Sequence, residues 1–220
     1  VSAFNRVAYP LLASINDDAK RLKSIYSKLM KLIVFVILPI LVYLGIVAEP
    51  FIRWLLTEKW LSAVPYFQLL LISGMFYPIH KYNLNICNVK GRSDLVLKLS
   101  MLQNALLLIG AVSVIWYGIY GLLYSLVIVN VLVTFINAFV SGNLIDYGFK
   151  KQIKDLFPTF ILNGGLGIIF YFVHIGLLQN LNDLSILVII GFTYALLYIL
   201  FGYVFKFSAL DELKNLKKNR

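Results

Sequence analysis

Long apolar runs alternate with short polar connectors along the whole chain. The runs Leu32–Ala48 and Leu184–Phe205 contain no charged residue at all. A helix needs roughly 20 apolar residues to cross a hydrocarbon core, whereas barrel strands alternate apolar and polar positions over about ten. The pattern therefore predicts an all-α fold, a polytopic transmembrane helix bundle of about six spans. We expect these spans near residues 32–52, 63–86, 97–117, 121–142, 157–178 and 185–206.

The segments outside the spans are basic. Residues 207–220 are expected to form a basic cytoplasmic tail, and residues 1–31 a cytoplasmic amphipathic lead-in. In the lead-in Leu22, Ile25 and Leu29 recur at helical spacing with lysines between them. This pattern fits an interfacial helix on anionic lipid headgroups and equally fits a charged lead-in to the first span.

Composition and charge distribution support a membrane protein. The chain is 60% hydrophobic and only 14% charged, whereas soluble domains average about 25% charged residues. Its net charge of +10 sits at the ends of the apolar runs, which argues against nucleic acid as a partner and for the lipid bilayer. Of the 20 basic residues, 17 fall on one side of the expected topology, which predicts that both chain ends are cytoplasmic.

Polar side chains at membrane depth are the candidate substrate-path residues, because burying them in hydrocarbon is costly. Lys81 could be a cation in a central cavity that attracts an anionic substrate such as a lipid pyrophosphate, or it could snorkel to the interface. Asn130 and Asn137 are seven apart and share a helix face, so they could contact sugar hydroxyls or form interhelical hydrogen bonds. The full candidate set is Lys81, His80, Asn85, Asn104, Asn130 and Asn137.

Other titratable residues predict structure rather than catalysis. Glu49 and Arg53 lie four apart at the outer end of the first span, a spacing typical of an ion pair. His80 and His174 lie on different spans outside any metal motif, and Cys87 is the single cysteine. We therefore expect no metal, no cofactor and no enzymatic activity.

Three motifs follow one another in the first 100 residues. They are Pro10–Asp18, then Leu55–Trp60 with Pro65 shortly after, then Gly91–Leu95. Together they resemble polysaccharide-biosynthesis flippases, of the O-antigen and exopolysaccharide type, in the multidrug/oligosaccharidyl-lipid/polysaccharide exporter superfamily. Two positions depart from that pattern: Asn16 replaces a common glutamine and Thr57 a common glycine. The matching residues are Pro10, Ser14, Asp17, Glu58, Lys59, Trp60, Pro65, Gly91 and Arg92.

The resemblance implies a transporter of two lobes around a central cavity. This chain would be the C-terminal lobe, with the N-terminal lobe of the same protein as its partner. The implied activity is translocation of undecaprenyl-pyrophosphate-linked oligosaccharide across the bacterial cytoplasmic (inner) membrane for surface polysaccharide biosynthesis. Other polysaccharide-assembly proteins are further expected partners. Alternatives are a multidrug or cation exporter of the same superfamily, a membrane-embedded glycan polymerase or transferase, and a passive membrane scaffold.

Overall fold

The computed structural model describes residues 9–178, 181–205 and 207. Within these residues the chain is helical with no strand, and six helices are long and apolar enough to cross a membrane. The predicted all-α polytopic bundle is therefore confirmed. The expected basic tail lies, apart from Phe207, outside the described residues. The long helices are α2 (Ala19–Ile46), α4 (Val64–Val89), α5 (Ser93–Ser113), α6 (Gly118–Leu144), α7 (Phe149–Leu177) and α8 (Asp183–Val204).

The part of the lead-in from Ala19 onward and most of the first expected span form one continuous helix, α2. The fully buried side chains of Leu22, Tyr26 and Met30 recur every four residues along one face of its first half. The helix ends at Ile46, and a short helix, α3 (Ala48–Leu56), follows it within the expected span 32–52. Pro50 lies in the first turn of α3, where a residue without an N–H is tolerated, but it could not continue the hydrogen bonding of α2.

The chain forms two compact units. Unit 1 comprises residues 1–34 and 73–156, and unit 2 comprises residues 35–72 and 157–220. Because the boundaries fall inside α2, α4 and α7, each of these helices contributes one segment to each unit.

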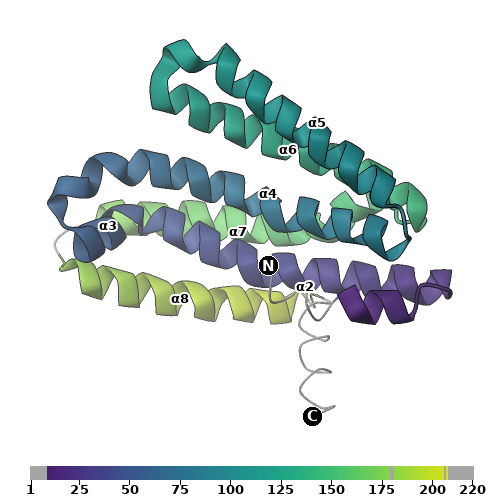
Figure 1. Ribbon diagram of the computed structural model, residues 1–220. Coiled ribbons are helices and arrows are strands. Elements are labelled where there is room, and N and C mark those ends of the chain that lie inside the picture. Colours follow the sequence, from purple (N-terminus) through teal and green to yellow (C-terminus); the bar gives the residue numbers. More distant parts are fainter. Residues whose placement is uncertain (1–8, 179–180, 206, 208–220) are drawn as a thin grey trace. The chain divides into compact units, whose positions relative to one another are not determined.

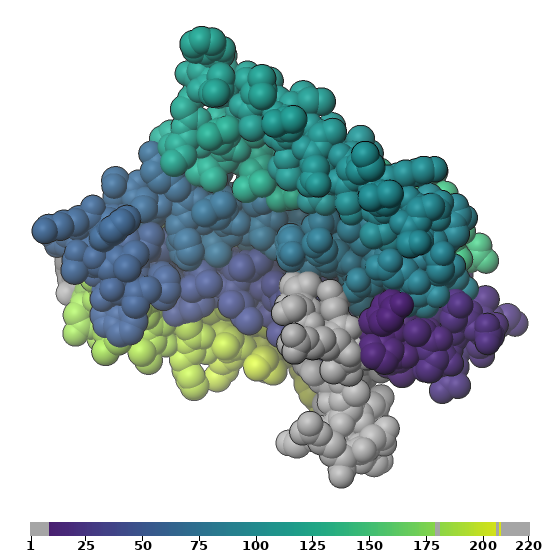
Figure 2. All heavy atoms as spheres, viewed as in Figure 1, coloured from purple at the N-terminus to yellow at the C-terminus, as the bar shows by residue number. Residues whose placement is uncertain are grey.

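In unit 1, α5 packs along α6, and the short 3-10 helix η2 (Ile115–Tyr117) connects them (Figure 1). The turn requires glycine at Gly121, where an added Cβ would lie 2.7 Å from the Val114 carbonyl oxygen. The side chains of α5 lie largely at the surface, as the teal atoms in Figure 2 show. Such an apolar surface suits contact with lipid and would be unusual in water. The exposed apolar residues of α5 include Leu97, Met101, Leu108, Ile109 and Val112.

Unit 2 has an apolar core with tyrosines at its centre. Tyr194 and Tyr198 of α8 are buried and stack with ring centroids 6.5 Å apart, and Phe170 of α7 meets Tyr194 edge-on. Gly167 allows close approach here, because an added Cβ would lie 3.0 Å from Val42 Cγ1. At Gly164 and Gly165, by contrast, an added Cβ meets open space. The core comprises Phe35, Ile46, Val47, Leu166, Phe170, Ile186, Leu187, Ile190, Tyr194 and Tyr198.

Candidate functional site

Helices α4 and α6 of unit 1 meet along a row of buried polar side chains, which we call the polar seam. The residues on each helix are three, four or seven apart and therefore share one face of that helix. The seam consists of Ser73, His80 and Asn83 on α4 and of Asn130, Thr134, Asn137 and Ser141 on α6.

Hydrogen bonds cross the seam at several levels. The Asn130 amide donates to the Ser73 hydroxyl oxygen over 2.6 Å. Seven residues further along each helix, the Asn137 amide nitrogen lies 3.5 Å from Nδ1 of His80. Such bonds satisfy polar groups that would otherwise be stranded in hydrocarbon. The structure thus brings together three of the predicted residues, His80, Asn130 and Asn137.

Asn83 joins three helices of unit 1. Its side-chain oxygen accepts from the Tyr26 hydroxyl of α2 over 2.8 Å and from the Ser141 hydroxyl of α6. Its amide nitrogen donates to the Ile79 carbonyl oxygen over 3.0 Å. Tyr26 also stacks on Tyr82, with ring centroids 4.7 Å apart. Asn83 therefore fixes α2, α4 and α6 against one another.

Two seam atoms keep unused hydrogen-bonding capacity. Nε2 of His80 and Oδ1 of Asn137 are buried and make no hydrogen bond to a described residue. The two side chains are 0% and 1% exposed, respectively. Buried polar atoms usually have a protein or water partner.

The remaining predicted substrate-path residues lie away from these contacts. The Lys81 ammonium lies 5.8 Å from the ring centroid of Tyr77, one turn earlier on α4, and forms no ion pair with a described residue. Asn85 is half-buried, and its amide nitrogen has no hydrogen-bond partner in the described part of the chain. Asn104 is exposed on α5.

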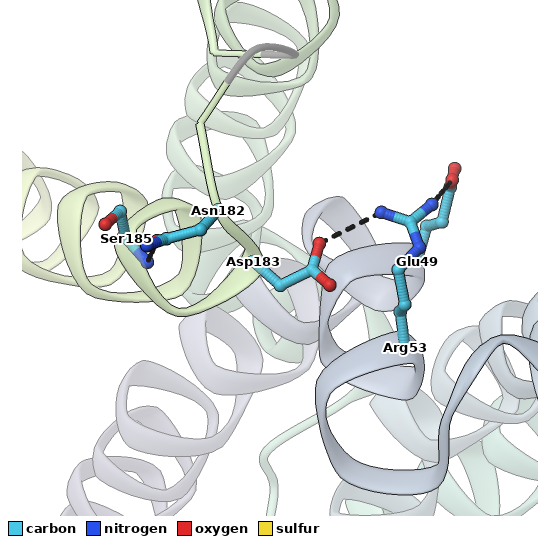
Figure 3. A network of polar contacts seen from close by, with 5 residues as sticks. All are labelled: Glu49, Arg53, Asn182, Asp183 and Ser185. Carbon is cyan, nitrogen blue, oxygen red and sulfur yellow. Dashed lines mark hydrogen bonds and ion pairs between the residues drawn. The ribbon is translucent and has the colours of Figure 1, made fainter.

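The pair Glu49–Arg53 is part of a larger network in unit 2 (Figure 3). Arg53 contacts Glu49 on its own helix and also donates to Asp183 Oδ1 at the start of α8 over 2.9 Å. Partial burial lowers the pKa of Arg53, but the two carboxylates outweigh this effect and raise it overall. Next to this network, the Asn182 side chain caps α8 by accepting from the Ser185 backbone N–H. Arg53 therefore ties α3 to the first turn of α8.

The structure gives backbone reasons for two of the family-motif positions. Gly91 has φ +68°, and Arg92 N donates to the Cys87 carbonyl oxygen over 2.8 Å, which closes the C-terminus of α4. Thr57, which stands where glycine is common, has φ 80° and ψ 169°, a region that almost only glycine adopts. Both motifs thus mark turns that end a helix.

The other motif residues lie near helix starts or at the surface. The exposed Glu58, Lys59 and Trp60 form the start of the 3-10 helix η1 (Glu58–Ala63), which leads into α4 with Pro65 in its first turn. Arg92 forms a two-point ion pair with Asp94, at 2.9 and 3.0 Å. The first motif precedes α2, and its members Pro10, Ser14 and Asp17 are exposed.

The candidate set from the sequence left out four of the seven seam residues, Ser73, Asn83, Thr134 and Ser141, and it did not include Asp183, the third member of the Arg53 network. Ser73, Thr134 and Ser141 are small hydroxyl residues, which apolar spans tolerate and which therefore attract little notice. A signal was present on α6, because Asn130, Thr134, Asn137 and Ser141 follow a regular four-three-four spacing. In the described part of the chain no three His, Cys, Asp or Glu side chains gather as metal ligands.

Within the described residues, six helices long and apolar enough to cross a membrane define a multi-pass α-helical membrane protein. A family model described as polysaccharide biosynthesis protein matches residues 1–65. The chain is similar to polysaccharide-biosynthesis proteins, as its motifs predicted. No solved structure matches it significantly.

Three curated relatives match most of the chain. An uncharacterized membrane protein in the cps region of Klebsiella pneumoniae is 29% identical over 64% of this chain and 31% of its own length. The teichuronic acid biosynthesis protein TuaB of Bacillus subtilis is 26% identical over 74% of this chain and 34% of its own. The lipopolysaccharide biosynthesis protein WzxC of Escherichia coli is 25% identical over 74% and 35%. The chain spans about a third of the length of these relatives.

Proposed function

We propose that the chain is part of a transporter that moves a lipid-linked oligosaccharide across the bacterial cytoplasmic membrane. One observation carries the proposal. Two relatives named for different polymers, teichuronic acid and lipopolysaccharide, are each similar in sequence to most of this chain. Polymers with different sugars need different sugar-joining enzymes. A step that can be common to both is the passage of a polar glycan through hydrocarbon. We infer that this passage is the step performed here.

The lipid that carries the glycan is proposed to be undecaprenyl pyrophosphate. The physical problem is to shelter a charged pyrophosphate and its sugars while the prenyl tail stays in lipid. A transporter with two lobes solves it by opening a polar cavity alternately to each side of the membrane. On this proposal the chain contributes one lobe and the rest of the protein contributes the other.

The polar seam joins the helices of unit 1 within this lobe. Its hydrogen bonds hold α2, α4 and α6 as a rigid group, so that a change of access can occur by movement between lobes. Lys81 sits next to the seam on α4 and has no carboxylate partner among the described residues. It is therefore our first candidate to attract the pyrophosphate, and Asn85 and Asn104 are candidates for sugar contacts.

The direct test follows lipid-linked sugar in cells that lack the intact gene. We expect lipid-linked oligosaccharide to accumulate on the cytoplasmic leaflet. In spheroplasts, a glycan-oxidising reagent that cannot cross the membrane should therefore fail to modify it. Surface polysaccharide should disappear, and the intact gene should restore it. Normal exposure of the oligosaccharide on the outer leaflet would refute the proposal, and measurement of dye and cation efflux would then test the exporter alternative.

A single substitution tests the role of Lys81. In the intact protein, Lys81→Ala should reduce transport strongly while Lys81→Arg, which keeps the charge, retains it. Lys98→Ala on α5 is the matched control, since it also removes one lysine. Unchanged transport by Lys81→Ala would show that this lysine only snorkels, and would leave the proposed function standing.

A further inference from the structure

A lysine-lined cavity of about 360 Å³ lies between the N-terminal halves of α2 and α7 in unit 1. The volume falls within the range of small-molecule sites, about 300–1,000 Å³. Six lysines from two helices distant in the sequence line it, with two serines, a tyrosine and one acid. The lining residues are Lys20, Lys23, Ser24, Ser27, Lys28, Lys31, Tyr147, Lys151, Lys154 and Asp155.

The helix pattern explains how these lysines come to one place. Lys20, Lys23, Lys28 and Lys31 of α2 all line this space, while Leu22, Tyr26 and Met30 between them are buried in unit 1. Lys151 and Lys154 lie three apart in the first two turns of α7 and face the same space. The lysines are thus held by a packed helix and not by a free terminal segment.

The acid in this cavity is already engaged by neutral donors. Asp155 Oδ2 accepts from the Ser27 hydroxyl over 2.8 Å and from the Tyr147 hydroxyl over 2.5 Å. Burial raises the pKa of Tyr147, and the hydrogen bond to Asp155 raises it further, so the phenol keeps the proton that it donates. Lys20, Lys23, Lys31, Lys151 and Lys154 form no ion pair with any described residue. The cavity therefore has a clear excess of positive charge.

The position of the cavity along the two helices is where lipid headgroups are expected. Its α2 lysines end immediately before the uncharged run that begins at Leu32, and Lys154 lies just before the apolar part of α7. Lysines at such positions meet the phosphate layer of a membrane. A ligand here therefore needs a compact negative charge and can carry an apolar chain into the bilayer.

We propose that this cavity binds a phosphate group, presented by an anionic lipid headgroup or as free pyrophosphate. The ammonium groups of the two helices surround the phosphate oxygens, and Ser24 adds a hydroxyl donor. Binding would hold α2 and α7 of unit 1 together through the shared anion. The inference rests on the cavity alone and does not depend on the proposed transport function.

The test measures phosphate binding by the intact protein purified in detergent. Native mass spectrometry scores retention of phosphatidylglycerol against phosphatidylcholine, and titration calorimetry measures affinity for inorganic pyrophosphate. We expect Lys151→Gln with Lys154→Gln to weaken anion binding about tenfold or more. The matched control is Lys98→Gln with Lys150→Gln, which removes the same charge outside the cavity and should change binding less than twofold.

Two further variants distinguish binding in this cavity from nonspecific attraction of anions by the net positive charge of the protein. Asp155→Asn should strengthen anion binding, because it removes the one negative group of the cavity. Lys151→Arg with Lys154→Arg should keep binding, which also shows that the fold tolerates change at these positions. Selective retention of phosphatidylglycerol without pyrophosphate binding assigns the lipid as the source, and measurable pyrophosphate binding assigns a free anion site. Equal binding by the wild type and the Lys151→Gln/Lys154→Gln variant, or equal loss in the control, overturns the proposal.

Discussion

The polar seam of unit 1 and the tyrosine core of unit 2 both join membrane-crossing helices, but they do so by different chemistry. The seam relies on side-chain amides and hydroxyls that bond to one another, with Asn83 as the shared acceptor. In the core, large rings fill space, and their hydroxyls reach single acceptors. Tyr198 donates to the Phe35 carbonyl oxygen, and Tyr194 to Asn163 Oδ1, each over 2.8 Å.

This difference predicts how substitutions in each region should change the stability of the protein. Helices in lipid gain little from apolar burial alone, so packing and hydrogen bonds decide their association. In the core, loss of a ring leaves a void, while loss of a hydroxyl removes one bond. In the seam, loss of the Asn83 amide removes an acceptor shared by two buried hydroxyls. The core should therefore be sensitive to volume and the seam to polarity.

The largest effect is expected in the core at Tyr194. Tyr194→Ala removes a buried ring that contacts Phe170 and should lower the free energy of unfolding by about 3 kcal/mol. Tyr194→Phe keeps the ring, loses only the bond to Asn163, and should cost about 0.6 kcal/mol. Denaturant titration of the purified protein in detergent measures both. Similar losses for the two variants would show that the hydroxyl, not ring volume, stabilises this core.

A smaller loss is expected in the seam at Asn83. Asn83→Ala leaves the Tyr26 and Ser141 hydroxyls without their acceptor and should cost about 2 kcal/mol. The same titration measures it, with Asn104→Ala on the exposed face of α5 as the matched control, expected to be neutral. If Asn83→Ala is as mild as Asn104→Ala, the seam does not depend on polarity and the contrast between the regions fails.

The turn that ends α4, next to the seam, allows a test of backbone conformation at Gly91. Gly91→Ala forces a side chain into positive φ and should cost about 1 kcal/mol. Gly45→Ala within α2 serves as control, because an added Cβ there meets open space and the helix tolerates it. Thermal unfolding in detergent should place Gly91→Ala below the wild type and Gly45→Ala at or above it. The reverse order would contradict the positive-φ role of Gly91.

The last expected effect is a gain in stability, at the connector between α3 and η1 in unit 2. Thr57 is a β-branched residue in a backbone region suited to glycine, so Thr57→Gly should relieve strain and stabilise the protein by about 1 kcal/mol. Thr57→Ser, which keeps a Cβ, should gain little and serves as the control. A melting temperature unchanged or lowered in Thr57→Gly would mean that the Thr57 side chain contributes contacts that outweigh the strain.

Much of the architecture was readable from the sequence because hydropathy is a local property. The expected span 185–206 agrees with α8 to within two residues at each end, whereas 97–117 begins and ends four residues later than α5. The expected first span differs most, and the fourth ends slightly early. Pro50 starts a new helix inside the first, and α6 continues past Gly142 to Leu144. Gly142 is instead needed for close approach, because an added Cβ would lie 2.7 Å from the Tyr147 carbonyl oxygen.

The candidate site was only partly readable. Asn130 and Asn137 could be placed on one face of a helix, but their partners lie 57 positions earlier in the chain, on α4. Arg53 was expected to pair with Glu49, while its second partner, Asp183, lies 130 residues away. Spacing within one helix says nothing about the rotation of its neighbour, and that rotation decides which polar groups meet.

By itself, the sequence determined the number of membrane-crossing helices, the basic character of their ends, and the similarity to polysaccharide-biosynthesis proteins. Each of these depends on residue composition within about 20 positions or on short motifs. Only the tertiary structure decided that α4 and α6 share a polar seam and that the lysines of α2 and α7 line one cavity. The reason is physical: helix pairing depends on register and rotation, which all packed side chains of a unit determine together.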